Sequence, residues 1–342
     1  MSARIASISG AEHTAMLGLG VYRPERIVTN DEVAGPIDSS DEWIRTRSGI
    51  RTRRFASAEE TIISMSAAAA RDAIDAAEVD PATIDCVIVA TSTWLLLTPA
   101  AAPQIATELG LQNVAAFDVS AGCAGFCHAV ALASDLVKGG TARNALVIGV
   151  EKLTTTVNPK DRGTAFLFAD GAGAVVIGPS DEAGIGPTVW GSDGTQHRAI
   201  RQDKDWMEFF AEIDERGLDA VRPYLAMEGT AVFRWAAHSL EKVCRDAIEV
   251  AGLTPADLDA MVPHQANGRI IEIMARVLKL PEDCALANDI EEAGNTSAAS
   301  IPLAMEAMMR KGDAKPGGTA LLIAFGAGLS YAAQVVQLPN WK

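Results

Sequence analysis

Two stretches, Arg71–Cys86 (RDAIDAAEVDPATIDC) and Arg245–Ala260 (RDAIEVAGLTPADLDA), align without gaps and share eight of their sixteen residues. They start 174 positions apart, which is about half of the 342-residue chain. Each copy has the pattern of a helix, a turn that starts at proline, and the beginning of a strand. Helix–turn–strand units can also converge on Ala, Pro and Asp by chance, so this duplication is a prediction for the structure to test.

Apolar, strand-like runs alternate with alanine-rich helical stretches on both sides of these repeats. The expected strands are residues 16–22, 86–90, 114–119, 145–150 and 174–177, and the expected helices are 61–78, 99–109, 124–138, 231–251, 270–278 and 298–310. This alternation predicts an α/β fold. Because the strands are continuously apolar, we expect mainly parallel sheets with helices on both faces. We divide the chain into two halves, residues 1–182 and 183–342.

One segment, residues 197–222 (HRAIRQDKDWMEFFAEIDERGLDAVR), breaks this rhythm. It combines many charges with one tryptophan and two phenylalanines. A solvated surface insertion explains that composition better than a mobile flap beside an active site, and the sequence leaves both interpretations open.

The composition argues against several classes of protein. With a formal net charge of −15 and no basic stripe, the chain is not expected to bind nucleic acid. No apolar run approaches the roughly 18 residues of a membrane helix, and the N-terminal sequence does not have the pattern of a secretory signal. The five cysteines include no C-x-x-C pair, so structural zinc is not expected and a reducing, cytoplasmic location is.

The first candidate for chemistry lies in residues 117–132 (FDVSAGCAGFCHAVAL). An apolar strand ends, small residues form a tight turn, and Cys123 opens an apolar helix. Because the free N–H groups at a helix start favour negative charge, we expect the Cys123 thiol to tend toward the nucleophilic thiolate. The same N–H groups could receive the oxyanion of a thioester under attack. A buried, inert cysteine is the alternative, and we assign Cys127 to the core.

Two further candidates fall at related positions of the second half. The motif VPHQAN places His264 at the end of a strand, where open parallel sheets bind ligands, and GNTSAAS places Asn295 before a helix. The 174-residue offset pairs His264 with the end of a first-half strand, and pairs residues 295–297 with residues 121–123. Pseudo-twofold symmetry therefore brings Cys123, His264 and Asn295 to one cleft. A lone histidine is more often structural than catalytic. The prediction that His264 is catalytic therefore depends on the symmetry that places it beside Cys123 and Asn295.

With these motifs the chain resembles β-ketoacyl-[acyl carrier protein] synthase III, the initiating condensing enzyme of type II fatty acid synthesis, and its actinobacterial branch most of all. The similarity runs from GVYRPER (20–26) through SSDEWIRTRSGI (39–50), GCAGF, VPHQAN and GNTSAAS to GAGLSYA (326–332). It implies a thiolase-like, duplicated α/β/α/β/α five-layer fold and a homodimer without metal or cofactor. The implied reaction is decarboxylative Claisen condensation of an acyl-CoA with malonyl-[acyl carrier protein], giving 3-oxoacyl-[acyl carrier protein], CoA and CO₂.

Motif by motif, the resemblance implies one Cys–His–Asn site. Cys123 would take up the acyl group. His264 and Asn295 would donate hydrogen bonds to the malonyl thioester carbonyl and stabilise the enolate as CO₂ leaves. The backbone N–H groups of Cys123 and Ala327 would form the oxyanion hole for acyl transfer.

The resemblance also implies a CoA site. Trp43 would stack on the adenine, and Arg47 and Arg162 would hold the adenine end and the phosphates. Asn267 and Phe325 would line the pantetheine tunnel.

Two further roles follow from the resemblance. Arg269, Arg276 and Lys279 would dock the acidic carrier protein, which a chain with this net charge can bind only through a local basic patch. Thr98 matches the end of the acyl pocket, in a segment that reaches toward the partner's pocket in homodimeric relatives. Relatives that prefer very short primers carry Phe there, so the smaller Thr98 predicts that chains longer than acetyl are accepted.

Other proteins of this fold, most of them enzymes, are the alternatives to this function. A starter ketosynthase of a polyketide pathway shares every catalytic residue named above and is the alternative function. A degradative thiolase needs a second reactive cysteine late in the chain, and residues 326–332 contain none. A chalcone-synthase-type enzyme would carry proline in place of Ala327. A non-catalytic binding protein would be expected to lack one of Cys123, His264 or Asn295.

Overall fold

The computed structural model describes residues 5, 6 and 8–341, and its strands form two large sheets. The first sheet has the order β15 (Asn340–Trp341), β1 (His13–Tyr22), β7 (Asp170–Ser180), β6 (Asn144–Lys152), β4 (Ile84–Ala90), β5 (Ala115–Val119). The second has the order β12 (Ala285–Leu286), β11 (Ala260–Pro263), β13 (Thr319–Phe325), β14 (Tyr331–Gln337), β8 (Val189–Gly191).

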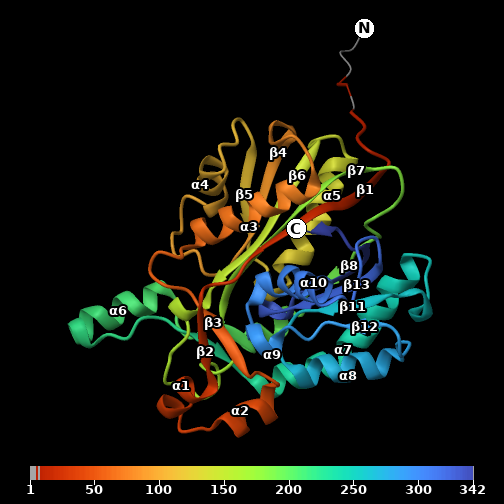
Figure 1. The fold of residues 1–342 in the computed structure, drawn as a ribbon. Coiled ribbons are helices and arrows are strands. Elements are labelled where there is room, and N and C mark those ends of the chain that lie inside the picture. Colours follow the sequence, from red (N-terminus) through yellow and green to blue (C-terminus); the bar gives the residue numbers. More distant parts are fainter. Residues whose placement is uncertain (1–4, 7, 342) are drawn as a thin grey trace.

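Helices pack on both faces of each sheet (Figure 1). The outer face of the first sheet carries α3 (Ile62–Ala77) and α4 (Ala101–Glu108), and the far side of the second carries α7 (Gly229–Val250) and α8 (Gly268–Leu278). Between the sheets lie α5 (Gly125–Lys138) and α10 (Ser300–Lys311). Every residue of α10 from Ser300 to Met309 is buried, as expected for a helix packed on all sides. The predicted five-layer α/β/α/β/α fold is confirmed.

The internal repeat is visible in the strand order. The series β5-β4-β6-β7-β1 corresponds to β12-β11-β13-β14-β8. The 174-residue offset places β4 on β11, α5 on α10 and β6 on β13, with every end within two residues, and places α3 on the later part of α7. The boundary at residues 182 and 183 falls in the connection between β7 and β8 and remains a prediction.

Strand direction differs from the mainly parallel expectation. Strand β4 runs parallel to β5 and β6, and β11 runs parallel to β12 and β13. However, β7 is antiparallel to β1 and β6, and β14 is antiparallel to β13 and β8. Apolar runs report only that both faces are covered, whereas direction depends on connection length. Residues 326–330, between β13 and β14, are too few for the crossover that a parallel pair requires.

Smaller elements complete the chain. They are α1 (Asn30–Ala34), α2 (Asp41–Ser48), α9 (Ile290–Ala293), and the antiparallel pair β2 (Arg26–Thr29) and β3 (Thr52–Phe55). The segment 197–222 contains β9 (Ile200–Gln202) and α6 (Trp206–Arg216), and β9 pairs with β10 (Leu225–Met227). Helix α6 projects from the body of the molecule and has no buried residue (Figure 1). Within residues 5, 6 and 8–341, no helix is both long and apolar enough to span a membrane.

Candidate active site

The structure brings the three chemical candidates to one cavity of about 880 Å³. Cys123 follows β5 of the first half, whereas His264 and Asn295 follow β11 and α9 of the second half. Each sheet ends its parallel strands at one edge, and the close approach of Gly326, after β13 (Thr319–Phe325), to the backbone of Cys123 brings the edges of the two sheets together. The walls are largely apolar side chains, as in ligand-binding cavities generally. We call the part formed by Cys123, His264, Asn295 and the polar groups around them the floor of the cavity.

Cys123 lies in the 3₁₀ turn Gly122–Ala124, directly before α5. Burial raises the pKa of its thiol to about 12; the nearby Glu151 carboxylate adds to the increase, and a hydrogen bond with Ser297 partly opposes it. The expected tendency toward the thiolate is therefore corrected, because the loss of solvation on partial burial favours the neutral thiol. The thiol must lose its proton as the acyl group arrives. Cys127 is fully buried, as predicted.

The backbone of residues 326 and 327 lies in close contact with the backbone of residues 122 and 123. A Cβ atom on Gly326 would lie 2.5 Å from the backbone nitrogen of Cys123, and one on Gly122 would lie 2.9 Å from that of Ala327. Only residues without a side chain permit this approach. The two N–H groups named for the oxyanion hole therefore sit on backbone segments in close contact.

His264 is 2% exposed, and burial lowers the pKa of its imidazole to about 3. The ring is therefore neutral near pH 7. Its Nδ1 lies 2.7 Å from the hydroxyl of Ser300, which also accepts a hydrogen bond from the backbone N–H of Gln265 at 3.3 Å. The Ser300 hydroxyl has one proton, and we assign it to Nδ1 of the neutral ring. That assignment leaves the proton of the ring on Nε2, as a neutral donor.

Asn295 is fixed by its backbone and by its side-chain oxygen. Its N–H donates to the carbonyl of Leu167 and its carbonyl accepts from Ala169, each at 2.9 Å. Its Oδ1 accepts from the backbone N–H of Ser297 at 2.9 Å. The Nδ2 group has no hydrogen-bond partner among the described residues, so its protons are available to a ligand. His264 and Asn295 thus present two neutral donors to one cavity.

The predicted CoA residues gather at one end of the cavity. The guanidinium groups of Arg47 and Arg162 lie 5.5 and 4.8 Å from the ring centre of Trp43. Phe166 supports this ring edge-on, at 5.1 Å between ring centres. An aromatic plane beside two cations suits a nucleotide base with adjoining phosphates.

Two other predicted cavity residues also line it. Asn267 caps α8 through its Oδ1, which accepts from the N–H of Arg269, and its Nδ2 donates to the carbonyl of Arg47. Phe325 packs edge-on against the imidazole of His264, at 5.5 Å between ring centres. Thr98 is exposed and lies outside the lining of its own chain's cavity.

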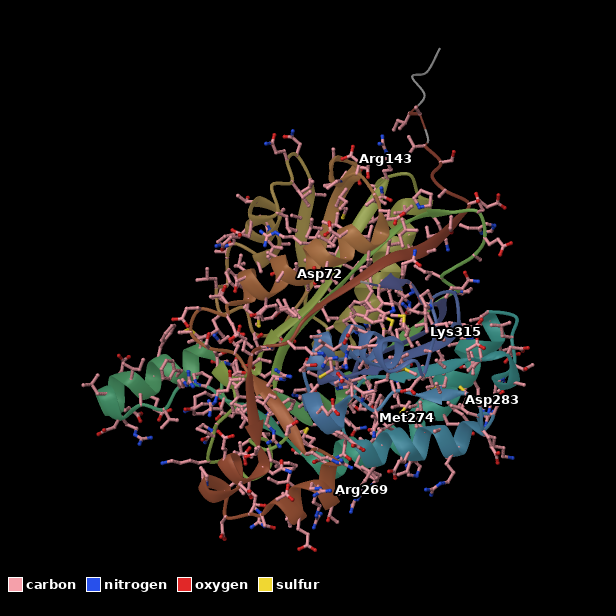
Figure 2. All side chains as sticks on the ribbon, in the orientation of Figure 1. Asp72, Arg143, Arg269, Met274, Asp283 and Lys315 are labelled. Atoms are coloured by element: carbon pink, nitrogen blue, oxygen red, sulfur yellow. The ribbon has the colours of Figure 1, made fainter. Side chains whose placement is uncertain are left out.

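The three predicted docking residues all lie on α8 or at its end. Arg269, Arg276 and Lys279 are exposed, and Arg269 also lines the cavity. Figure 2 shows Arg269 at the start of α8, next to α2, and Asp283 beyond the far end of the helix. Of these three residues, Arg269 alone lines the cavity.

Sequence reasoning missed several polar residues of the floor. Ser297 and Ser300 lie in the GNTSAAS motif; Ser297 donates its backbone N–H to Asn295, and the Ser300 hydroxyl contacts His264. Glu151 is fully buried at the end of β6. One signal was available for it: it is the single acidic residue in the strand NALVIGVEK, and that strand ends at the edge where Cys123 lies.

The segment 197–222 is only partly a surface insertion. Helix α6 is exposed, as predicted, but Ile200, Gln202 and Trp206 line the cavity. The charges of the segment predict its exposed part. They do not predict that β9 pairs with β10, and it is β9 that brings Ile200 and Gln202 to the cavity.

Comparison with known proteins gives consistent matches along the chain. Residues 117–194 match the family model of 3-oxoacyl-[acyl-carrier-protein] synthase III, and residues 248–338 match the model of its C-terminal part. The β-ketoacyl-[acyl-carrier-protein] synthase III of Mycobacteroides abscessus is 58% identical over 335 residues, covering 98% of both chains. A mycobacterial synthase III from Mycobacterium marinum is 56% identical over 98% of this chain and 99% of its own.

Solved structures agree with these sequence matches. The priming β-ketosynthase of the R1128 polyketide pathway superposes with a TM-score of 0.94 at 47% identity, over 99% of this chain and 100% of its own. The 3-oxoacyl-(acyl carrier protein) synthase III of Pseudomonas aeruginosa superposes with a TM-score of 0.87 at 36% identity, over 97% of this chain and 100% of its own.

Proposed function

Because the chain belongs to the 3-oxoacyl-[acyl-carrier-protein] synthase III family, in its actinobacterial branch, we propose that Cys123, His264 and Asn295 perform the family's reaction here. The protein is an acyltransferase that condenses an acyl-CoA primer with malonyl-[acyl carrier protein] and so initiates type II fatty acid synthesis. The products are 3-oxoacyl-[acyl carrier protein], CoA and CO₂.

In the first half-reaction, the Cys123 sulfur attacks the acyl-CoA thioester and expels CoA. The developing oxyanion lies between the N–H groups of Cys123 and Ala327, whose backbones are in close contact. Trp43, Arg47 and Arg162 hold the adenine and phosphates, and Asn267 and Phe325 flank the pantetheine arm.

In the second half-reaction, malonyl-[acyl carrier protein] loses CO₂ and its carbanion attacks the acyl group on Cys123. The enolate oxygen accepts hydrogen bonds from Nε2 of His264 and Nδ2 of Asn295. Neutral donors suit this step, because they stabilise negative charge where it develops and need no proton transfer beforehand. The single observation that carries the proposal is this pair of neutral, fixed donors in the cavity that also holds a cysteine.

The test is incubation with a ladder of acyl-CoAs from acetyl to dodecanoyl, followed by intact mass measurement. The wild type is expected to gain the mass of one acyl group, and Cys123→Ala is expected to gain none. Cys284→Ala removes a thiol outside the cavity and should label like the wild type. Absence of an adduct from every acyl-CoA would contradict the proposal.

The 47% identity to a priming ketosynthase of a polyketide pathway favours one second candidate function. Both functions use the same three catalytic residues, so the residues cannot distinguish them. The two functions differ in the carrier protein that delivers the malonyl group. We expect a higher kcat/KM with malonyl groups on a fatty acid carrier protein than on a polyketide carrier protein. The reverse preference would assign the chain to polyketide initiation.

A homodimer is supported by one exposed apolar edge. Strand β5 ends the first sheet with Phe117 37% exposed, and Leu95, Leu96 and Leu97 are 55%, 55% and 88% exposed. Open sheet edges and apolar patches of this kind are generally covered by a partner. Light scattering should give the mass of two chains for the wild type and of one chain for Leu97→Asp.

Primer length is proposed to depend on Thr98 of a second copy. In one chain Thr98 is exposed, whereas the neighbouring Leu95 and Leu97 line the chain's own cavity. A dimer through this edge would bring Thr98 to the second cavity, where its small side chain leaves room for long primers. Thr98→Phe should shift the preferred acyl-CoA toward acetyl, and unchanged long-chain activity would contradict this.

The carrier protein is proposed to dock on Arg269, Arg276 and Lys279. These exposed cations are the local basic surface that an acidic carrier protein requires on a chain of net charge −15. Arg276→Glu should raise the KM for malonyl-[acyl carrier protein] and leave acylation by acyl-CoA unchanged, because Arg276 lies outside the cavity lining. All five cysteines are free thiols, which supports the reducing cytoplasm as the compartment.

A further inference from the structure

Gln265 follows His264 directly in the chain, and the reaction described above gives it no part. Its side chain is 1% exposed and lies outside the lining of the cavity. A buried amide needs hydrogen-bond partners for its two N–H groups and for its oxygen. The position of those partners therefore shows which parts of the protein Gln265 holds together.

The amide of Gln265 has backbone partners on two sides. Its Nε2 donates to the carbonyl of Pro263 at 2.7 Å and, more weakly, to that of Ala287 at 3.4 Å. Its Oε1 accepts from the backbone N–H of Ile290 at 3.0 Å. Because carbonyls only accept and an N–H only donates, these partners fix which amide atom is oxygen and which is nitrogen. The side chain therefore connects the end of β11 to the start of α9.

Helix α9 continues this connection to Asn295. The carbonyl of Ile290 accepts from the backbone N–H of Gly294 at 3.1 Å, and Asn295 is the next residue. Hydrogen-bonded peptide groups thus run from the Gln265 side chain through Ile290 and Gly294 to the Asn295 turn. A displacement of Ile290 would therefore also displace Asn295.

The backbone of Gln265 supports the other side of Asn295. Its N–H donates at 3.3 Å to the hydroxyl of Ser300, which lies 2.7 Å from Nδ1 of His264. Ser300 is the first residue of α10. Both ends of residues 290–300 are therefore held by residues 264 and 265, and Asn295 lies between these ends.

These contacts bear on the distance between the two proposed enolate donors. His264 follows β11, whereas the backbone of Asn295 is hydrogen-bonded to Leu167 and Ala169 of the first half. Two donors can serve one oxygen only if each lies about 3 Å from it. We infer that Gln265 is a positioning residue, which fixes the spacing of His264 and Asn295 so that both donate to the same enolate oxygen. This inference rests on the proposed roles of these two residues.

The enolate forms only in the second half-reaction, so the test measures acylation and condensation separately. We would follow acylation by rapid quench and intact mass, and condensation from enzyme acylated beforehand by prolonged incubation. Gln265→Met keeps the length of the side chain and removes the hydrogen bonds of its amide. Its condensation rate is expected to fall about 10- to 100-fold, because a displacement of about 1 Å can cost that much, and its acylation rate to stay within about twofold.

Gln334→Met is the matched control. Gln334 lies on β14, is 0% exposed and is outside the cavity lining. Its amide also has partners inside the protein: Nε2 donates to the carbonyl of Cys127 at 3.4 Å, and Oε1 accepts from the hydroxyl of Thr188 at 3.3 Å. Urea unfolding should show a loss of stability in both variants, whereas only Gln265→Met should lose condensation relative to acylation.

A second variant keeps the test available if Gln265→Met does not fold. Gln265→Asn retains the amide but is one methylene shorter, so it cannot reach from Pro263 to Ile290. We expect the same selective loss of condensation. In an Asn295→Ala background there is no second donor to position, so either change at Gln265 should cost much less there than in the wild type.

A selective loss of condensation that is largely absent in the Asn295→Ala background would support the inference. Condensation at the wild-type rate, an equal loss in both half-reactions, or losses that add fully to that of Asn295→Ala would overturn it. If the wild type is not acylated by any acyl-CoA, or if Asn295→Ala condenses like the wild type, the proposed function fails instead.

Discussion

The floor of the cavity and its rim are built in opposite ways. At the floor, His264 is 2% and Asn295 5% exposed, and backbone hydrogen bonds or buried hydroxyls hold both. At the rim, Leu97 is 88% and Trp206 37% exposed, on a loop and at the start of a projecting helix. The packed floor fixes the geometry of the chemistry. The rim lacks such support, so it is suited to adapting to the length of the acyl chain and to a second copy.

The largest effect is expected from a change at the floor. Asn295→Ala removes one of two donors to the enolate, and loss of such a donor costs about 100-fold or more in rate. Condensation should fall by that factor while acylation by acyl-CoA is retained, as measured in separate half-reactions. Asn288→Ala, at an exposed asparagine outside the cavity, is the control. Equal losses in both half-reactions would contradict the separation of roles.

A second change tests how tightly the floor is packed. The Cβ of Gly326→Ala would lie 2.5 Å from the Cys123 nitrogen, so the two backbones must move apart. We expect at least a tenfold slower acylation, and a loss of about 1–3 kcal/mol in the free energy of unfolding. Gly194→Ala, where a Cβ meets nothing within 4 Å, should change neither quantity. Stopped-flow kinetics would measure the acylation rate, and urea unfolding would measure the stability. Equal values for the two variants would contradict the close packing at Gly326.

The floor also predicts how stability depends on pH. Burial lowers the pKa of His264 from 6.5 to about 3, so between these values the unfolded chain binds a proton that the folded chain does not. This contribution to stability is fully present above pH 6.5 and is lost as the pH falls toward 3. The slope is about 1.4 kcal/mol per pH unit. The difference in unfolding free energy between the wild type and His264→Gln should follow this slope, and a pH-independent difference would argue against a neutral histidine.

The smallest effect is expected at the rim. Trp206 lines the cavity from the exposed helix α6, so Trp206→Ala should lower kcat/KM a few-fold for dodecanoyl-CoA and leave acetyl-CoA unchanged. Met207→Ala, at a neighbouring residue that is 73% exposed and outside the cavity lining, is the matched control. A loss with acetyl-CoA as large as with dodecanoyl-CoA would place Trp206 in the chemistry and weaken the comparison.

The sequence predicts the floor better than the rim for a physical reason. The duplicated segments fix strand order, so the 174-residue offset brings Cys123, His264 and Asn295 together without side-chain detail. Strand direction was mispredicted because apolar runs do not report connection length. Glu151 was missed because a buried acid is recognisable only once its donors are known. The position of residues 197–222 depends on pairing between β9 and β10, which a local pattern does not specify.

The pairing of β15 with β1 has a consequence for synthesis on the ribosome. Gly18 pairs with Asn340, and Leu19 with Trp341, so one edge of the first sheet is completed by residues near the opposite end of the described chain. The central helix α5 likewise packs against β13 and β14, which are translated much later. The first half therefore leaves the exit tunnel with an open strand edge and an apolar helix uncovered. Because residues translated later cover these surfaces, the first half stays exposed to association until the second half arrives.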